Sequence, residues 1–94
     1  MEGIYNMEAL QARIESDKGL LLYFSSESCS VCKVLKPKVA GLLLEKFPGM
    51  SALYVDTEKS PLIAGQYRVF TIPTILIYFN GREQVRYSRN ISMH

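Results

Sequence analysis

The chain has 94 residues, 48% of them hydrophobic, and a formal net charge of +2. This length fits one domain, residues 1–94, with a small core, and the low charge gives no electrostatic basis for binding nucleic acid. No run of 18 apolar residues occurs, so we expect no membrane span. The N-terminus lacks the basic and apolar regions of a signal peptide, so we expect a cytoplasmic protein. Arg82, Arg86 and Arg89 are interpreted as a solvated strand face.

The first part of the chain is predicted to form a helix and then a central strand. Asn6 is a suitable helix N-cap, and Gly19 marks the expected stop. Three apolar residues recur between them at helical spacing: Met7, Leu10 and Ile14. Ile4 and Tyr5 are expected to add a short edge strand. Leu20 to Phe24 is apolar at every position, which is typical of a strand that is covered on both faces.

The chain has two cysteines, and two residues stand between them in the stretch Ser28-Cys29-Ser30-Val31-Cys32-Lys33. A helical pattern follows from Val34 to Phe47, with Pro37 in its interior, where proline is expected to kink the helix. The preceding strand therefore delivers the cysteines to the first turn of a helix. Free N–H groups and a partial positive charge at that end stabilise a thiolate. Cysteines at this spacing can also close a disulfide, so the pattern predicts thiol–disulfide exchange.

The second half of the chain is predicted to contain a strand, a helix and a β-hairpin. The strand is Leu53 to Val55, closed by Asp56, and Ser60-Pro61 provides an N-cap and first position for a helix that runs to Tyr67. The hairpin consists of Thr74–Phe79, the turn Asn80-Gly81 and the antiparallel partner Arg82–Tyr87. This order of elements predicts an α/β fold, a mixed sheet with helices on both faces.

These features together resemble the thioredoxin family over nearly the whole chain. The matching positions are Cys29-Ser-Val-Cys32-Lys33, Pro37 inside the following helix, Asp56 at a strand end, Ile72-Pro73-Thr74 and the Asn80-Gly81 turn. A CxxC pair alone is less specific than its combination with a distant Ile-Pro-Thr in this order of elements. Glutaredoxin is the nearest competitor, and the helix before the first central strand argues against it. The resemblance implies a thioredoxin fold, a central mixed sheet flanked by helices.

The resemblance also implies an enzyme, a protein thiol–disulfide oxidoreductase. Cys29 would be the nucleophile that attacks a substrate disulfide, and Cys32 would resolve the mixed disulfide. Pro73 matches the family's cis-proline, and with Thr71 and Ile72 it would offer backbone to an extended substrate peptide. Three further residues would support the site: Tyr23, Lys33 and Pro37. The implied partners are protein disulfide substrates and an unidentified reductase, with no cofactor and no metal.

The chain departs from the family pattern near the cysteines. Ser28 and Ser25 stand where the family usually has tryptophans, and Ser30-Val31 replaces Gly-Pro between the cysteines. Tyr23 occupies the position of a buried aspartate that accepts a proton, and Ala52 occupies that of its lysine partner. Because both ionisable members are gone together, no buried charge is left unpaired. We therefore expect altered proton handling and an altered substrate surface.

The same residues have less specific interpretations. Paired cysteines also ligate zinc, but one CxxC and a lone His94 do not supply about four ligands. Most prolines follow a trans peptide bond, since only about 5–6% of X–Pro bonds are cis; for Pro73 the family match favours cis. Tyr23 is interpreted as a core aromatic rather than a proton relay.

Two classes of function remain open: the oxidoreductase, and a non-enzymatic thioredoxin-like binding module or redox sensor that uses the Pro73 groove. One further departure concerns the C-terminal helix of the family: the sequence stops at residues 88–94, where that helix would only be starting, so we expect either a shortened form of the chain or a protein without the helix. That helix would cover part of the sheet, so strand Thr74–Phe79 is expected to leave an apolar patch. We expect a homodimer through this face, an exchange of elements between two chains, or marginal stability.

Overall fold

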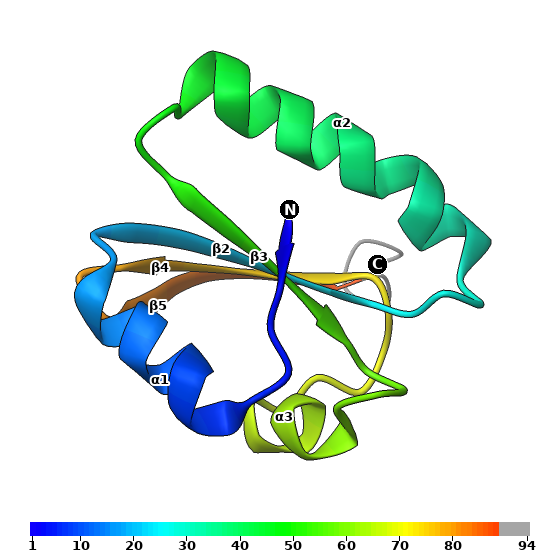
Figure 1. Cartoon of the computed structure of the whole chain (residues 1–94). Coiled ribbons are helices and arrows are strands. Elements are labelled where there is room, and N and C mark those ends of the chain that lie inside the picture. Colours follow the sequence, from blue (N-terminus) through cyan, green and yellow to red (C-terminus); the bar gives the residue numbers. More distant parts are fainter. Residues whose placement is uncertain (89–94) are drawn as a thin grey trace.

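The computed structural model describes residues 1–88 and places eight helices and strands in them (Figure 1). In chain order they are β1 (Glu2–Gly3), α1 (Met7–Ser16), β2 (Gly19–Ser25), α2 (Ser30–Lys46), β3 (Ser51–Asp56), α3 (Pro61–Gln66), β4 (Thr74–Phe79) and β5 (Arg82–Ser88). The predicted order of elements is confirmed. The predictions that concern Arg89, His94 and a C-terminal helix fall outside the described residues.

The five strands form one mixed sheet in the order β1-β3-β2-β4-β5. Strand β2 pairs in parallel with β3 and antiparallel with β4, and β4 pairs antiparallel with β5. Helix α2 covers one face of the sheet, and α1 and α3 cover the other (Figure 1). Every residue of β2 is buried, because this strand lies at the centre of the sheet between two helical layers.

Local capping explains where α1 begins. The Asn6 side chain accepts a hydrogen bond from the amide of Ala9 at 3.0 Å, as predicted for an N-cap. The helix ends at Ser16, however, and Gly19 begins β2 instead of stopping the helix. The short edge strand also differs from its prediction: it is Glu2–Gly3, because these residues pair in parallel with Leu53 and Tyr54 of β3.

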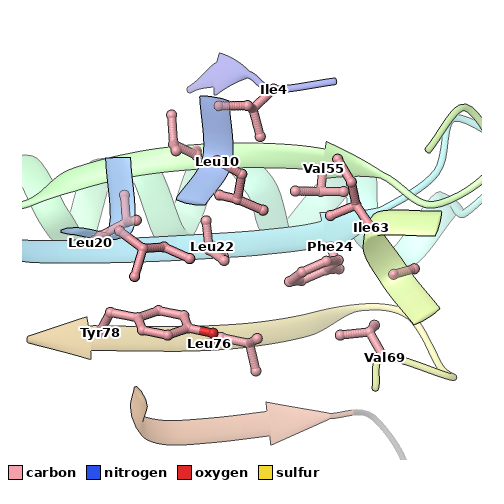
Figure 2. Packing of buried hydrophobic residues seen from close by; sticks show 13 residues of the cluster. Ile4, Leu10, Leu20, Leu22, Phe24, Val55, Ile63, Val69, Leu76 and Tyr78 are labelled. Carbon is pink, nitrogen blue, oxygen red and sulfur yellow. The ribbon is translucent and has the colours of Figure 1, made fainter. Parts of the chain in front are cut away.

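The larger hydrophobic cluster fills the space between the sheet and the layer of α1 and α3. It joins alternate residues of β2 and β3 to residues of both helices (Figure 2). Its members are Ile4, Leu10, Ile14, Leu20, Leu22, Phe24, Leu53, Val55, Ile63, Ala64, Val69, Leu76 and Tyr78. Because side chains alternate along a strand, the other residues of β2 face α2.

The smaller hydrophobic cluster lies between the sheet and α2. Its fully buried members are Leu21, Tyr23 and Leu43. Ile75 and Ile77 of β4 are half-buried against it, so the apolar surface predicted for Thr74–Phe79 is partly covered by contacts with this cluster. This second layer brings Tyr23 of β2 beneath the helix that carries the cysteines.

The β4–β5 hairpin forms as its sequence predicts. Asn80 and Gly81 have φ values of 54° and 81°, the left-handed conformations that a two-residue hairpin turn requires. Strand β5 extends one residue beyond its prediction, to Ser88. Arg86 of this strand is not simply solvated: its guanidinium donates to the carbonyl oxygens of Tyr67 at 2.8 Å and Arg68 at 3.1 Å.

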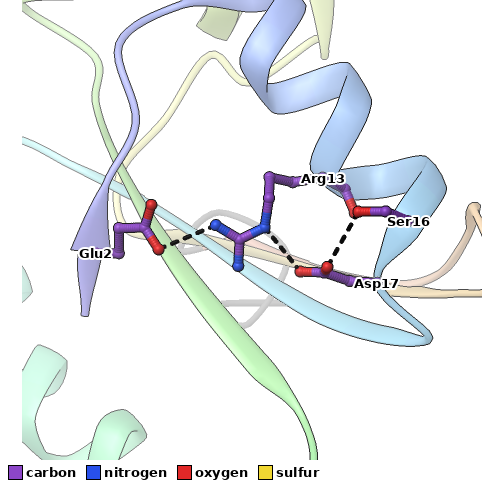
Figure 3. A network of polar contacts seen from close by, with 4 residues as sticks. All are labelled: Glu2, Arg13, Ser16 and Asp17. Carbon is purple, nitrogen blue, oxygen red and sulfur yellow. Dashed lines mark hydrogen bonds and ion pairs between the residues drawn. The ribbon is translucent and has the colours of Figure 1, made fainter.

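A polar network ties β1 to α1 at one end of the sheet. Arg13 of α1 donates to Glu2 and to Asp17, each at 3.0 Å, and Ser16 donates to Asp17 at 3.2 Å (Figure 3). This network lies on the α1 side and contributes to holding the short strand β1 in place. Over residues 1–88, no helix has the length and apolar character needed to cross a membrane.

Candidate active site

The two cysteines are joined by a disulfide at the N-terminal end of α2. Their Cα atoms are 5.3 Å apart, within the ordinary range for a disulfide. The central strand β2 ends at Ser25, and the turn that follows leads to Cys29, the N-cap of α2. The predicted arrangement, a strand that delivers the pair to the first turn of a helix, is confirmed.

The positions of the two sulfurs in the helix differ. The Cys29 sulfur accepts a hydrogen bond from the amide of Cys32 at 3.2 Å, in the manner of an N-cap side chain. Cys29 is half-buried, whereas Cys32 is 1% exposed. The helix terminus therefore offers an N–H donor and its partial positive charge to the Cys29 sulfur, the more accessible of the two.

Tyr23 lies directly behind the cysteine pair. It is fully buried, and its hydroxyl donates a hydrogen bond to the carbonyl oxygen of Cys32 at 2.8 Å. Burial, with a smaller contribution from Tyr54, raises the pKa of Tyr23 to about 12. The phenol is therefore neutral across the physiological range, where it donates a hydrogen bond and carries no charge.

A pocket of about 310 Å3 opens beside Cys32. It lies between the N-terminal part of α2 and the strands, and its lining residues are Met1, Gly3, Tyr5, Ser25, Ser26, Glu27, Cys32, Lys33, Lys36 and Tyr54. The Lys36 ammonium lies 4.0 Å from the centre of the Tyr54 ring, a cation–π contact. The pocket thus places two lysines and solvent next to the otherwise buried Cys32.

Acidic residues lie close to the turn before Cys29. The Ser28 hydroxyl donates to Glu58 at 2.6 Å, and Glu27 forms an exposed ion pair with Lys59 at 3.5 Å. Glu58 comes from the turn after β3, which Asp56 organises by accepting hydrogen bonds from two backbone amides. Two acidic side chains, Glu27 and Glu58, therefore lie close to the cysteine motif.

Residues Thr71, Ile72 and Pro73 form the half-buried segment that leads into β4. The Ile72–Pro73 peptide bond is cis, as predicted. The Thr74 hydroxyl donates to the carbonyl oxygen of Thr71 at 2.7 Å. Because Thr74 pairs with Phe24 near the end of β2, this segment lies at the same end of the sheet as the turn that leads to Cys29 (Figure 1).

The residues predicted to support the site differ in how close they lie to the cysteines. Lys33 lines the pocket beside Cys32, whereas Pro37 lies exposed inside α2. Sequence reasoning missed Lys36, although its spacing of four residues from Cys32 places both on one face of the helix. It also missed the contact of Ser28 with Glu58, which are 30 residues apart and gave no local signal.

The described residues contain no group of three or more histidine, cysteine, aspartate or glutamate side chains that would hold a metal ion. What the site brings together is a reversible disulfide, a helix terminus and a buried phenol. This arrangement carries out dithiol–disulfide exchange, in which two electrons enter or leave the cysteine pair.

Comparisons with known proteins agree with this chemistry. The family model described as Thioredoxin matches residues 3–93. A thioredoxin-like protein of Bacillus subtilis, YdfQ, is 27% identical over 89 residues, which cover 95% of this chain and 79% of that protein. A thioredoxin of Chlamydia trachomatis is 39% identical over 67 residues, which cover 71% of this chain and 65% of that protein.

The fold has close relatives among solved structures. The X-ray structure of Fasciola hepatica thioredoxin superimposes with a TM-score of 0.85 at 26% identity, and the match covers 94% of this chain and 86% of that one. The predicted thioredoxin fold is therefore confirmed. Family match, fold and CxxC disulfide agree: the chain belongs to the thioredoxin family and is a thiol–disulfide oxidoreductase.

Proposed function

We propose that the chain reduces disulfides of protein substrates, with Cys29 as the nucleophile and Cys32 as the resolving thiol. The observation that carries this assignment is the asymmetry of the pair. Cys29 caps the helix and is half-buried, whereas Cys32 is 1% exposed. A substrate sulfur reaches Cys29 first, and the helix terminus favours the thiolate there.

The reaction proceeds in two exchanges. The Cys29 thiolate attacks one sulfur of the substrate disulfide, and the other substrate sulfur leaves as a thiolate that takes up a proton. Cys32 then loses its proton and attacks the Cys29 sulfur, which forms the Cys29–Cys32 disulfide and releases the second substrate thiolate. Two electrons pass to the substrate, and a reductase then supplies two new electrons that reduce the Cys29–Cys32 disulfide again.

Substrate recognition is assigned to Thr71, Ile72 and Pro73. The register of β4 with β2 supports this role, because it places the segment at the end of the sheet where Cys29 lies. An extended substrate peptide would pair with this backbone as an added strand. Hydrogen exchange tests the assignment: in a mixed disulfide of Cys32→Ser with a peptide, the amides of Thr71 and Ile72 should exchange more slowly than in the free protein.

Reduction of insulin, followed by turbidity with dithiothreitol as electron source, tests the activity. Wild type should accelerate precipitation, and Cys29→Ser should not. Lys38→Ala, an exposed change on α2, should behave as wild type. In a separate reaction without dithiothreitol, Cys32→Ser that has been reduced beforehand should accumulate a mixed disulfide with insulin, which a non-reducing gel detects. The alternative function, a binding module or redox sensor, predicts that wild type binds substrate without accelerating the reaction.

Two further proposals concern assembly and location. Val85 and Tyr87 of β5 pair with Ile77 and Ile75, so they lie on the α2 side of the sheet, and Tyr87 is 59% exposed. A second copy of the chain that covers Tyr87 would form the proposed homodimer.

A cytoplasmic location is proposed from the sequence alone, and cell fractionation tests it.

A further inference from the structure

The neutral phenol of Tyr23 stands where the resemblance leads one to expect a base. The resolving step requires that Cys32 lose a proton before its sulfur attacks Cys29. Among the hydrogen bonds of the described residues, the Tyr23 hydroxyl donates to the carbonyl oxygen of Cys32, and the Cys29 sulfur accepts from the Cys32 amide. A phenol that stays protonated does not accept a thiol proton at neutral pH, so Tyr23 has another role.

We infer that Tyr23 is a positioning residue that holds Cys32 for attack on Cys29, and that the proton of Cys32 leaves through the pocket beside it. This inference rests on the proposed roles of Cys29 and Cys32. In this view the Tyr23 hydroxyl orients the Cys32 thiol, and a different part of the site removes its proton.

The hydrogen bond of Tyr23 acts on the backbone of the reacting residue. Cys32 is the third residue of α2, and its carbonyl oxygen has two lone pairs, so it accepts the Tyr23 hydroxyl in addition to a helical partner. Tyr23 itself is fixed, because it is fully buried in the smaller hydrophobic cluster with Leu21 and Leu43. A rigid donor thus fixes the first turn of α2, and small displacements of a reacting atom slow an attack strongly.

The pocket supplies the route for the proton. Cys32 is 1% exposed overall, yet it lines the pocket of about 310 Å3. The ionisable groups of the residues that line this pocket are the α-amino group of Met1, Tyr5 after β1, Glu27 in the turn after β2, Lys33 and Lys36 of α2, and Tyr54 of β3. The two lysine ammonium groups favour a nearby thiolate, and water that enters the pocket takes up the proton.

A stopped-flow reaction with Ellman's reagent, a small aromatic disulfide, separates the two exchanges. The first thionitrobenzoate is released by Cys29 at a rate proportional to reagent concentration. The second is released when Cys32 attacks the mixed disulfide, at a rate that is independent of reagent concentration. Both phases are followed by absorbance between pH 6 and pH 9, and the fold of each variant is checked by circular dichroism.

Three variants and the wild type test the inference. Tyr23→Phe removes only the hydroxyl, and it should slow the second phase about three- to tenfold while the first phase is unchanged. Tyr78→Phe removes a hydroxyl from another buried tyrosine, on the other face of the sheet, and should change neither phase. In wild type the second phase should rise up to about tenfold per pH unit between pH 6 and pH 8. Tyr23→Asp should make this phase faster at pH 6, and its rate should reach a plateau at a lower pH than in wild type.

Two results would overturn the inference. The first is an unchanged second phase in folded Tyr23→Phe, which would show that the hydroxyl does not position Cys32. The second is a wild-type second phase that does not vary between pH 6 and pH 8, which would show that an internal base accepts the proton. Both results can be obtained even if Tyr23→Asp does not fold. A failure of the proposed function appears elsewhere, as a lack of insulin reduction or as activity in Cys29→Ser.

Discussion

The backbone amide of Cys32 donates a hydrogen bond to the sulfur of Cys29 at 3.2 Å, so the side chain of Cys29, the proposed nucleophile, caps the helix that carries Cys32. After reduction, the same amide remains at the helix terminus to stabilise a Cys29 thiolate. We expect mild iodoacetamide treatment of the reduced protein to alkylate Cys29 before Cys32. Peptide mapping by mass spectrometry measures this, and preferential labelling of Cys32 would reverse the assigned roles.

Two glycine substitutions should change stability in opposite directions. Gly81 has a φ of 81° in the β4–β5 turn, so Gly81→Ala should cost about 1–2 kcal/mol. Gly41 lies inside α2, and an added Cβ there meets no atom within 4 Å, so Gly41→Ala should stabilise the protein by about 0.5–1 kcal/mol. Urea unfolding measures both, and equal effects would contradict the assigned turn geometry.

The sequence predicts the elements of this fold better than the contacts of its site. Asn6, the strand Thr74–Phe79 and the Asn80-Gly81 turn were all located, because each depends on neighbouring residues. The strand β1 was placed two residues too late, because its position depends on pairing with β3, a partner about 50 residues away.

The same distinction applies to the site. The CxxC pair is local and was identified, whereas the hydrogen bond from Tyr23 to Cys32 depends on how α2 lies over β2. The contact of Lys36 with Tyr54 depends on how the same helix lies over β3. Such contacts depend on how helices and strands pack together, so the spacing of residues within one helix or strand does not predict them.

Asp17 should make stability depend on pH. Burial alone would raise the pKa of its carboxyl, but hydrogen bonds from Arg13, Ser51 and Ser16 and the charge of Arg13 outweigh burial and lower the pKa below its ordinary value of 3.8. A lowered pKa in the folded state stabilises the protein above pH 3.8, and this contribution is lost as the pH falls further.

Asp17→Asn should therefore reduce the free energy of unfolding at pH 7 by about 1 kcal/mol, and the difference from wild type should shrink as the pH falls toward 3. Urea unfolding at several pH values measures it. Glu15→Gln, an exposed change on the same helix, is the control and should have little effect. A difference that is independent of pH would contradict the role of the Asp17 charge.

Arg86 should be structurally important although it lies on an edge strand. Its guanidinium joins Glu83, at 2.9 and 3.0 Å, to the carbonyl oxygens of Tyr67 and Arg68 after α3. Arg86→Ala should cost about 1–3 kcal/mol in urea unfolding, since these acceptors lose a charged donor. Arg86→Lys should recover only part, because an ammonium lacks the planar fork. Arg82→Ala, at an exposed position, should stay within about 0.5 kcal/mol of wild type.

Self-association should depend on the α2 side of β5. Strand β5 pairs with β4 and forms one edge of the described sheet, and Tyr87 on this side is 59% exposed. Tyr87 pairs with Ile75, and Val85 pairs with Ile77; both isoleucines are half-buried, and the proposed interface would cover them together with Tyr87. Burying them would remove apolar area from water in both chains.

Sedimentation velocity between about 1 and 100 µM, a range in which weak interfaces of small area associate, should show a sedimentation coefficient that rises with concentration. Tyr87→Lys should shift the chain toward the monomer, because a charge replaces an exposed aromatic ring in the proposed interface. Tyr5→Lys is the matched control, since Tyr5 is also 59% exposed but follows β1 at the opposite edge of the sheet. A wild-type coefficient that stays constant and monomeric over this range would exclude the proposed homodimer.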